Sequence, residues 1–237
     1  MTSAGSIRRR GAVAAAFAGL AAAAIAVGVA MPGADAAATK VLGKTKNSPK
    51  PACPKDCTAF ASATGFQLEA NGKKGLFKAK EDGQIVAWAV DVSRPDKSQR
   101  KFFGNNFSAQ PVGDNPAARV SVLKPLKGKN FRLKDHSPLM SLEGLMGEEQ
   151  TFTLNNPMPI KEGDILALTV PTWLPALASG LDRQETAWRA SRKQGKCGPA
   201  LGEIKDGKPQ ENIGSKRAYG CTYNLDRLLY WGYYLPD

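Results

Sequence analysis

The sequence predicts an all-β protein, an antiparallel β-sandwich of the jelly-roll-like type with about nine or ten strands. Three observations lead to this fold class. Short segments alternate apolar and polar residues with a period of two, they are rich in β-branched and aromatic residues, and clusters of Gly, Pro, Asn and Asp separate them. No stretch carries an apolar stripe of helical period over three turns, although residues 137–149 and 174–188 could each hold one helical turn.

Period-two alternation predicts which side chains point into the core. It occurs in the segments "GQIVAWAVDV", "ARVSVLKP", "NFRLKD" and "QTFTL". The side chains expected to face inward are Val86, Trp88, Val90, Val92, Val120, Val122, Phe131, Leu133, Phe152 and Leu154.

Two tight connections are expected between later strands. In "NNPMPIKEGDILALTVPTW", Gly163-Asp164 stands where a hairpin turn between "PMPI" and "ILALTV" needs a positive φ. A second hairpin is predicted around Asn224-Leu225-Asp226, between "YGCTYN" and "RLLYWGYYL". Both turns have a backbone reason to exist, whether or not a ligand binds there.

Residues 1–36 have the organisation of a secretory signal peptide. Arg8, Arg9 and Arg10 precede the apolar run "GAVAAAFAGLAAAAIAVGVA", and small residues at Ala34 and Ala36 suit a signal peptidase. Cleavage after Ala36 is therefore expected, with Ala38 as a second position. The alternative is an uncleaved membrane anchor, because the apolar run approaches the ~18 residues that can span a bilayer.

The remaining chain is expected to be a polar leader followed by one domain. Residues 37–57 are rich in Lys and Pro and have no apolar period, whereas residues 58–237 are long enough for a single sandwich domain with its own core. No segment after the signal peptide is expected to lie in a membrane. The mature protein is predicted to be secreted or associated with the cell envelope.

Four cysteines fall in the part of the chain expected to be exported. An even number in such a protein predicts disulfides, with three possible connectivities. The preferred pairs are Cys53–Cys57 and Cys197–Cys221, of which the second closes a loop rich in Gly, Pro, Lys and Asn. A zinc site is the alternative for the C-x-x-x-C spacing, but a second tight Cys/His pair is missing.

The charge of the exported chain favours anionic partners. Removal of residues 1–36 takes away three Arg and one Asp, so the formal charge of +12 falls to +10. Wall polymers, anionic lipid or acidic polysaccharide would suit this excess, although lysines that only keep the loops solvated are the simpler alternative. Nucleic acid is not expected, since no recognition helix or RNA-binding signature accompanies the charge.

Five residues are candidates for ligand binding. Four are basic residues of one segment, and the fifth is the tryptophan expected to be the most exposed, which could stack on a sugar ring. They are Lys124, Lys127, Lys129, Arg132 and Trp173. For Trp173, packing in the core or in a loop is favoured over exposure.

Catalytic residues, metal ligands and cofactors are not expected. His136 is the single histidine, and neither a G-x-S-x-G elbow nor H-E-x-x-H occurs. A pair of carboxylates at hydrolase spacing is the one enzymatic arrangement that distant strands could still assemble. The candidates are Glu143, Glu148, Glu149, Glu162 and Asp164. Calcium is a further possibility at "GDNP" and "KEGD", which are more simply interpreted as turns.

The segments "GQIVAWAVDV", "ARVSVLKP", "PIKEGDILALTV", "AWRASRKQGKC" and "YGCTYNLDRLLY", in this order, resemble a group of uncharacterised exported β-sandwich proteins of high-GC Gram-positive bacteria. The resemblance covers most of residues 58–235. It implies a jelly-roll-like fold and the disulfide Cys197–Cys221, and it implies no catalytic residue. The stretch 94–116 is longer than the usual connection in this group.

The sequence therefore predicts an exported, non-catalytic β-sandwich that binds a cell-envelope glycan or an anionic wall polymer. A structural or protein-interaction module without a small ligand is the first alternative, and an exposed sheet edge would favour it. A carbohydrate-active hydrolase with paired carboxylates is the second alternative.

Overall fold

The computed structural model describes residues 38–237, so the predicted signal peptide lies outside the described residues. The strands of the described part are β1 (Lys40–Leu42), β2 (Phe60–Ala70), β3 (Lys73–Lys74), β4 (Gly83–Asp91), β5 (Ala117–Pro125), β6 (Asn130–His136), β7 (Met140–Ser141), β8 (Glu149–Ile160), β9 (Ile165–Leu174), β10 (Leu177–Ala178), β11 (Thr186–Ala190), β12 (Lys216–Ala218), β13 (Cys221–Tyr223), β14 (Arg227–Leu228) and β15 (Tyr230–Pro236). The helices are α1 (Lys97–Asn106) and α2 (Leu201–Lys205).

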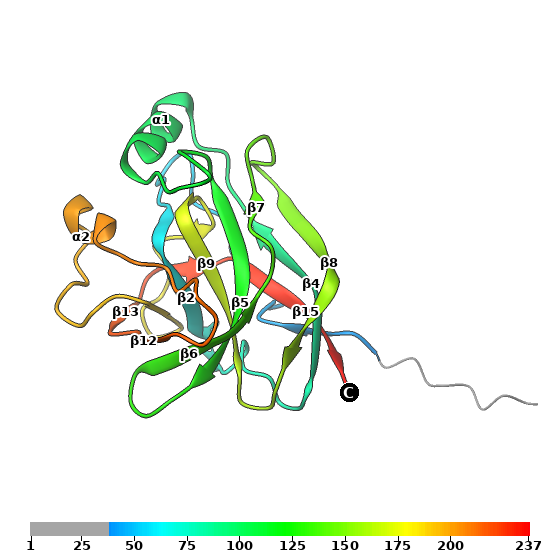
Figure 1. The fold of residues 1–237 in the computed structure, drawn as a ribbon. Coiled ribbons are helices and arrows are strands. Elements are labelled where there is room, and N and C mark those ends of the chain that lie inside the picture. The colour runs from blue at the N-terminus through cyan, green and yellow to red at the C-terminus, as the bar shows by residue number, and fades with distance from the viewer. Residues whose placement is uncertain (1–37) are drawn as a thin grey trace, which may run out of the picture. The chain divides into compact units, whose positions relative to one another are not determined.

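Two antiparallel sheets form the body of the fold (Figure 1). The larger sheet has the strand order β12-β6-β5-β9-β2-β11-β13, with β3 paired to β2 and β7 paired to β5. The smaller sheet has the order β1-β15-β4-β8, and β10 pairs with β14. The predicted all-β antiparallel sandwich is confirmed. More strands exist than predicted, because strands of two or three residues are too short to show a period.

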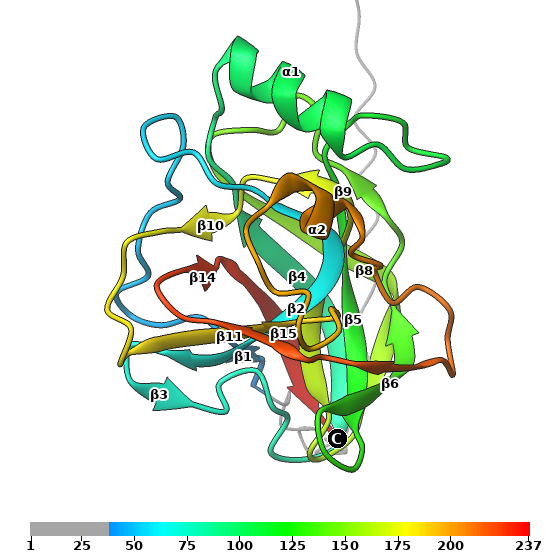
Figure 2. The same ribbon diagram turned by 90° about the vertical axis from the view of Figure 1, so that its left-hand side faces the viewer.

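The main core lies between the two sheets, and a second, smaller core lies elsewhere on the larger sheet. The main core includes Trp88, Val120 and Leu168. The second core consists of Phe66, Leu123, Phe131, Leu133, Ala167 and Tyr219. The loop between β11 and β12, which includes α2, lies on the outer side of the larger sheet, away from the smaller sheet (Figures 1 and 2).

The predicted inward pattern holds on most strands and fails at one bulge. Phe131 and Leu133 are buried, whereas Phe152 and Leu154 are half-buried against the main core. Val86 is half-buried and Ile85 is fully buried, contrary to the prediction. In the pairing with β15, the adjacent Tyr233 and Tyr234 lie opposite Ala87 and Ile85, so Val86 is an extra residue of β4, and such a bulge reverses the inward parity beyond it.

The two predicted hairpins are wrong, although their strands exist. β8 pairs with β4, whereas β9 pairs with β2 and β5, so the turn at Gly163 links the two sheets. Gly163 has the predicted positive φ of 86°. Likewise β13 pairs with β11, whereas β14 pairs with β10. A turn residue fixes the local bend, but it does not choose the partner strand.

The segment predicted to be a separate leader packs onto the sandwich within the described residues. β1 pairs with β15, and the side chain of Leu42 is buried. The buried Arg227 donates to Thr45 Oγ1 and Asn71 Oδ1, both at 3.0 Å. Residues 38–57 therefore belong to the same compact unit as the rest of the described chain.

Helix α1 was not predicted from the sequence, because the prediction relied on the apolar pattern. Asp96 caps its first turn: the Asp96 carboxylate accepts from the Gln99 N–H at 2.9 Å, and the Gln99 side chain accepts from the Asp96 N–H at 2.8 Å. This capping box is visible as D-x-x-Q in the sequence. The helix lies in the stretch that is long for the resembled group, and Phe103 packs on Trp173 with ring centroids 5.2 Å apart.

Candidate anion-binding site

The four predicted basic residues lie in and beside the hairpin of β5 and β6. Lys124 on β5 is directly opposite Arg132 on β6. Lys127 and Lys129 are exposed in the connecting turn, which the Leu126 N–H closes by donating to the Asn130 carbonyl at 2.9 Å. The structure therefore brings all four basic candidates together.

Strand β12 adds a fifth basic residue that the sequence did not indicate. Lys216 on β12 is directly opposite Arg132 on the other side of β6. Lys124, Arg132 and Lys216 thus form a row across three neighbouring strands, which we call the basic row. None of the three belongs to an ion pair of the described residues. The pairing of β6 with β12 spans 84 residues of sequence, so local patterns carry no signal for it.

The alternation of β6 explains why the basic row stays at the surface. Phe131 and Leu133 point to the second core, where Phe131 packs against Phe66 and Tyr219 with ring centroids 5.0 and 4.9 Å away. Arg132 lies between them in the sequence and therefore points to the opposite face of the sheet. The apolar face is covered, and the basic face remains half-exposed at Arg132 and exposed at its two neighbours.

The loop between Cys197 and Cys221 is fixed to the larger sheet by the buried Gln210. Its amide donates to the Ser215 carbonyl at 2.8 Å, and its backbone N–H donates to Thr64 Oγ1 at 2.9 Å. The Tyr219 hydroxyl donates to Gln210 Oε1 at 2.9 Å. Burial raises the pKa of Tyr219 well above its usual range, so this hydroxyl keeps its proton.

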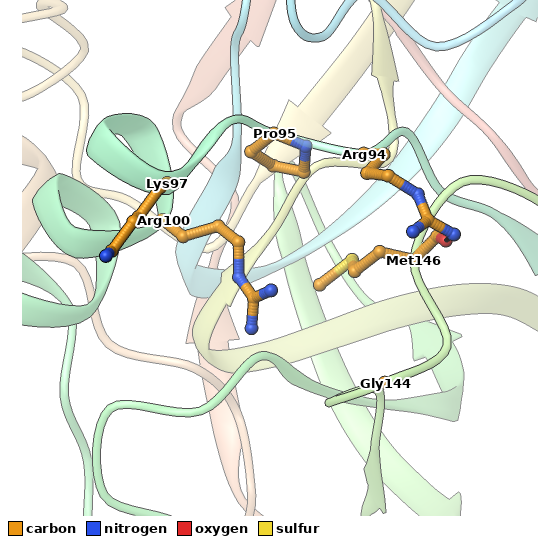
Figure 3. A pocket seen from close by; sticks show the side chains of 6 residues that line it. All are labelled: Arg94, Pro95, Lys97, Arg100, Gly144 and Met146. Carbon is orange, nitrogen blue, oxygen red and sulfur yellow. Dashed lines mark hydrogen bonds between the residues drawn. The ribbon is translucent and has the colours of Figure 1, made fainter.

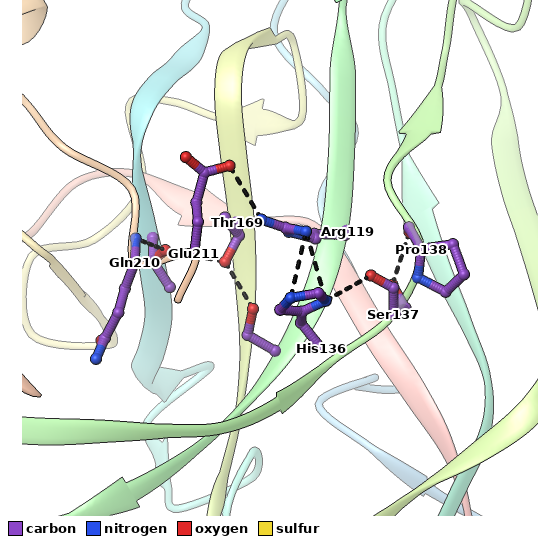
Figure 4. Close-up of polar contacts among 9 residues, drawn as sticks. Arg119, His136, Ser137, Pro138, Thr169, Gln210 and Glu211 are labelled. Carbon is purple, nitrogen blue, oxygen red and sulfur yellow. Dashed lines mark hydrogen bonds and ion pairs between the residues drawn. The ribbon is translucent and has the colours of Figure 1, made fainter. Parts of the chain in front are cut away.

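A neighbouring polar contact joins the same loop to β5 (Figure 4). Arg119 makes an ion pair with Glu211 at 3.0 Å, and its guanidinium also lies 3.4 Å from His136 Nδ1. Burial lowers the pKa of Arg119. His136 is half-buried, and its Nδ1 lies 3.1 Å from the Ser137 carbonyl. The single histidine thus makes polar contacts with Arg119 and Ser137, and it lines a hollow of about 630 Å³ between β6 and β8.

Both predicted disulfides are confirmed. Cys53 is bonded to Cys57, and Cys197 is bonded to Cys221. The second bond brings the start and the end of the loop together beside Arg192.

Arg192 lines a small basic cavity on the outer side of the larger sheet. The cavity has a volume of about 270 Å³, and we call it the Arg192 cavity. Its lining includes five basic and two acidic side chains: Arg192, Lys193, Lys196, Lys208, Arg217, Glu203 and Asp206. Only 8% of Arg192 is exposed, and no carboxylate of the described residues lies within ion-pair distance of it.

An aromatic stack holds the Arg192 guanidinium in place. Arg192 Nη1 donates to the Tyr223 hydroxyl at 3.1 Å, and Nη2 donates to the Ala61 carbonyl at 3.4 Å. Tyr223 stacks on Trp188 with ring centroids 4.3 Å apart, and burial raises the pKa of Tyr223. The guanidinium is therefore a fixed positive charge with N–H groups to spare.

A second basic hollow lies beside α1, but the arginines that line it have partners within the protein (Figure 3). Arg94, Lys97 and Arg100 line a space of about 490 Å³. The Arg94 guanidinium donates to the Met146 carbonyl at 2.7 Å, and Arg100 is ion-paired with Glu143. Both arginines thus have contacts that stabilise the protein itself.

Trp173, the best candidate for an exposed tryptophan, is buried, so it offers no face to a ligand. Only 2% of this residue is accessible, and its Nε1 donates to the Asp114 carbonyl at 2.8 Å. Trp173 belongs to β9, a strand buried on both faces, so the flanking prolines did not indicate a loop. All four tryptophans are buried, which removes the predicted flat face for a sugar ring.

The acidic candidates make separate local contacts. Glu149 pairs with Lys44 at 3.0 Å, and Glu143 pairs with Arg100. Asp164 is buried in its turn, where its carboxylate accepts from the Lys161 N–H at 3.1 Å. Within residues 38–237, no group of three or more His, Cys, Asp or Glu side chains has the arrangement of a metal site.

Comparisons with protein-family models, with curated proteins and with solved structures give no match for this chain. The resemblance to exported sandwich proteins therefore stays a prediction. Among the described residues, no helix has the length and apolar character needed to span a bilayer.

Proposed function

We propose that the protein is exported and binds an anionic polymer of the cell envelope through the basic row and the two turn lysines. The basic row carries this proposal. Residues directly opposite each other in an antiparallel pair are close neighbours, and opposed like charges are destabilising. A polymer that places negative charges along the row would offset this repulsion. The two disulfides support export, because such bonds persist in oxidising compartments.

The spacing of the row suits a chain that crosses the strands. Neighbouring strands lie about 4.8 Å apart, so the three charges span roughly 10 Å. The turn lysines Lys127 and Lys129 extend the same positive region beyond the end of β5. Salt screens the attraction between exposed charges, so polymer binding to these lysines should weaken as the salt concentration rises.

Co-sedimentation with cell-wall sacculi tests this function. The purified protein is mixed with sacculi that retain or lack their anionic polymers, over a series of salt concentrations. We expect sedimentation with the intact sacculi, a steep loss of binding as salt rises, and no binding after the polymers are stripped. Binding that survives high salt and yields to free neutral sugar would contradict the proposal.

A matched pair of variants distinguishes the contribution of the basic row to polymer binding from the contribution of the net charge. The site variant is Lys124→Gln, Arg132→Gln and Lys216→Gln, and the control is Lys46→Gln, Lys55→Gln and Lys101→Gln. The control residues are exposed, belong to no ion pair of the described residues and lie on other elements. We expect affinity to fall about tenfold or more in the site variant only. An equal loss in both variants would mean that net charge alone attracts the polymer.

A protein-interaction function is the second candidate, and the edge of the smaller sheet favours it. β8 is an edge strand of twelve residues with exposed side chains at Thr151 and Thr153. Pro157 and Pro159 lack N–H groups, which makes the C-terminal half of this edge a poor partner for another strand. A photoreactive residue at position 151, with position 212 as the control, would detect a partner that pairs with the other half. Cross-linking at neither position would argue against this candidate.

A further inference from the structure

The Arg192 cavity is built for a single charged group. Its volume of about 270 Å³ is at the lower limit of small-molecule sites, too small for a sugar chain. Its main feature is a cation that is more than nine-tenths buried. A buried charge is costly unless an opposite charge and hydrogen bonds compensate for it. Within the described residues, Arg192 has hydrogen-bond acceptors but no carboxylate within ion-pair distance, although Glu203 and Asp206 line the same cavity.

The unused donors of Arg192 mark where an anion would be held. Two of its five N–H groups have partners, and its Nε is buried without one. A Cβ on Gly207 would lie 2.8 Å from the Ile204 carbonyl and closer still to the Ser62 carbonyl, so a glycine at this position lets the loop lie close to β2 beside Arg192. The side chain is held by protein contacts and has no ion pair with another described residue.

The other lining residues favour phosphate. Lys193, Lys196 and Lys208 are exposed at the cavity, and Arg217 is half-exposed. Of the two acidic residues, Glu203 already accepts the Gly198 N–H. An arginine fork combined with ammonium groups is the usual donor set for phosphate oxygens, which accept several charge-assisted hydrogen bonds at once.

The walls of the cavity are fixed before any ligand arrives. The Ser191 hydroxyl accepts from the Thr64 N–H and donates to the Lys208 carbonyl, both at 2.9 Å. Gln210 and the Cys197–Cys221 bond hold the rest of the loop. A fixed set of donors loses little conformational entropy on binding.

Strand β12 contributes one residue to the basic row and one to the cavity. Lys216 belongs to the row and the next residue, Arg217, lines the cavity. Successive side chains of a strand point to opposite faces, and β12 is the edge strand of the larger sheet. A polymer that bends around this edge would contact the row on one face and the cavity on the other.

We propose that the Arg192 cavity binds a phosphate group of the anionic polymer, so that the ligand is a phosphate-rich polymer rather than a uronate. This inference rests on the proposed function for the source of the phosphate, but the cavity can be tested without the polymer.

Thermal unfolding of the whole protein with small anions is the first test. Inorganic phosphate is compared with acetate and chloride at equal ionic strength. We expect phosphate to raise the melting temperature by about 3 °C more than the other two at a concentration well above its dissociation constant. Equal shifts for the three anions would overturn the proposal.

Variants assign the effect to the cavity. Lys208→Gln and Arg217→Gln each remove a lining charge near the surface, and Lys205→Gln on α2 removes an exposed charge of the same loop that does not line the cavity. We expect the two lining variants to lose at least half of the phosphate shift and the control to keep it. Arg192→Lys should abolish the shift. A shift retained in both lining variants would overturn the site, even if Arg192→Lys fails to fold.

The polymer assignment has its own test. Binding to poly(glycerol phosphate) is compared with binding to a polyuronate of similar length and to vesicles of phosphatidylglycerol in phosphatidylcholine. Preference for the phosphate polymer supports the inference, whereas equal binding to the polyuronate or preference for the vesicles would overturn the polymer as the source. The basic-row variant should lose polymer binding and keep the inorganic phosphate shift. If the proposed function fails, polymer binding would be absent, whereas the shift of the melting temperature by inorganic phosphate would remain.

Discussion

Lys124 and Arg132 lie directly opposite each other on β5 and β6, so that two positive side chains share one cross-strand position. Arg132 meets a third positive side chain, Lys216, on its other side. Such a position normally favours an opposite charge or an apolar pair. A protein that keeps repulsion at an exposed place loses stability there, which is a common property of binding surfaces.

Replacement of Arg132 should therefore stabilise the protein and weaken its binding. In Arg132→Gln the repulsion from both neighbours disappears, and we expect the free energy of unfolding to rise by about 0.5 kcal/mol at low salt. Urea unfolding at low and high salt measures this effect, which should shrink as salt screens the wild-type repulsion. Co-sedimentation should show weaker polymer binding. A less stable variant at low salt would show that Arg132 has a structural partner instead.

Removal of the Gln210 side chain should release the loop. In Gln210→Ala the buried Tyr219 hydroxyl loses its acceptor and the Ser215 carbonyl loses a donor, so we expect a loss of about 2 kcal/mol or more. Hydrogen exchange should become faster in the loop between β11 and β13 and stay unchanged in β4. The control is Gln194→Ala, an exposed residue of the preceding segment, which should have little effect.

The two disulfides should contribute unequally. In the chain-entropy model, the Cys197–Cys221 bond closes a loop of 24 residue steps and is worth about 3 kcal/mol, whereas Cys53–Cys57 closes four and is worth about 2 kcal/mol. We expect Cys197→Ser with Cys221→Ser to lower the stability more than Cys53→Ser with Cys57→Ser. The first pair should also lose the phosphate shift of the melting temperature. A phosphate shift that survives would show that the cavity does not need this bond.

One carboxyl group should make stability fall as pH rises. Asp226 is half-buried, and burial raises its pKa above the ordinary value of 3.8. Since the folded state binds this proton more tightly than the unfolded state, the contribution is fully present below about pH 4 and is lost as pH rises through the raised pKa. We expect Asp226→Asn to be more stable than wild type at pH 7 and no more stable at pH 3.

Urea unfolding at the two pH values checks this prediction. Asp56→Asn, at an exposed position, is the control and should change little. A gain for Asp226→Asn at pH 3 as large as at pH 7 would mean that the effect is not electrostatic.

The larger strands were predictable because their period of two is a local property. Val120 and Val122 are buried as their alternation requires, and so are Phe131 and Leu133. The error at Val86 comes from a bulge opposite β15, which depends on the partner strand rather than on the segment itself. Strand partners were not predictable for the same reason.

The candidate site was predictable only in part. The turn and its four basic residues are close in the sequence. Lys216 joins the basic row only because β12 pairs with β6, and no local sequence pattern predicts that pairing. Arg192 gave no signal, since an arginine beside Lys193 in a Gly- and Lys-rich stretch is typical of a solvated loop. Its burial depends on Tyr223 and on the loop folded over it. Trp173 shows the opposite error, because prolines near a strand were interpreted as signs of a loop.

The place of β15 in the smaller sheet bears on how the chain reaches this structure. β15 lies between β1 and β4, so residues 40–42 have no partner in that sheet until residues 232–234 are present. A chain released gradually, whether from a ribosome or through a membrane pore, therefore cannot complete the sandwich early. Until that moment β4 exposes an unpaired edge, and contacts so distant in sequence form slowly. A chaperone that shields β4 would act on this intermediate, in which β15 has not yet paired with β4.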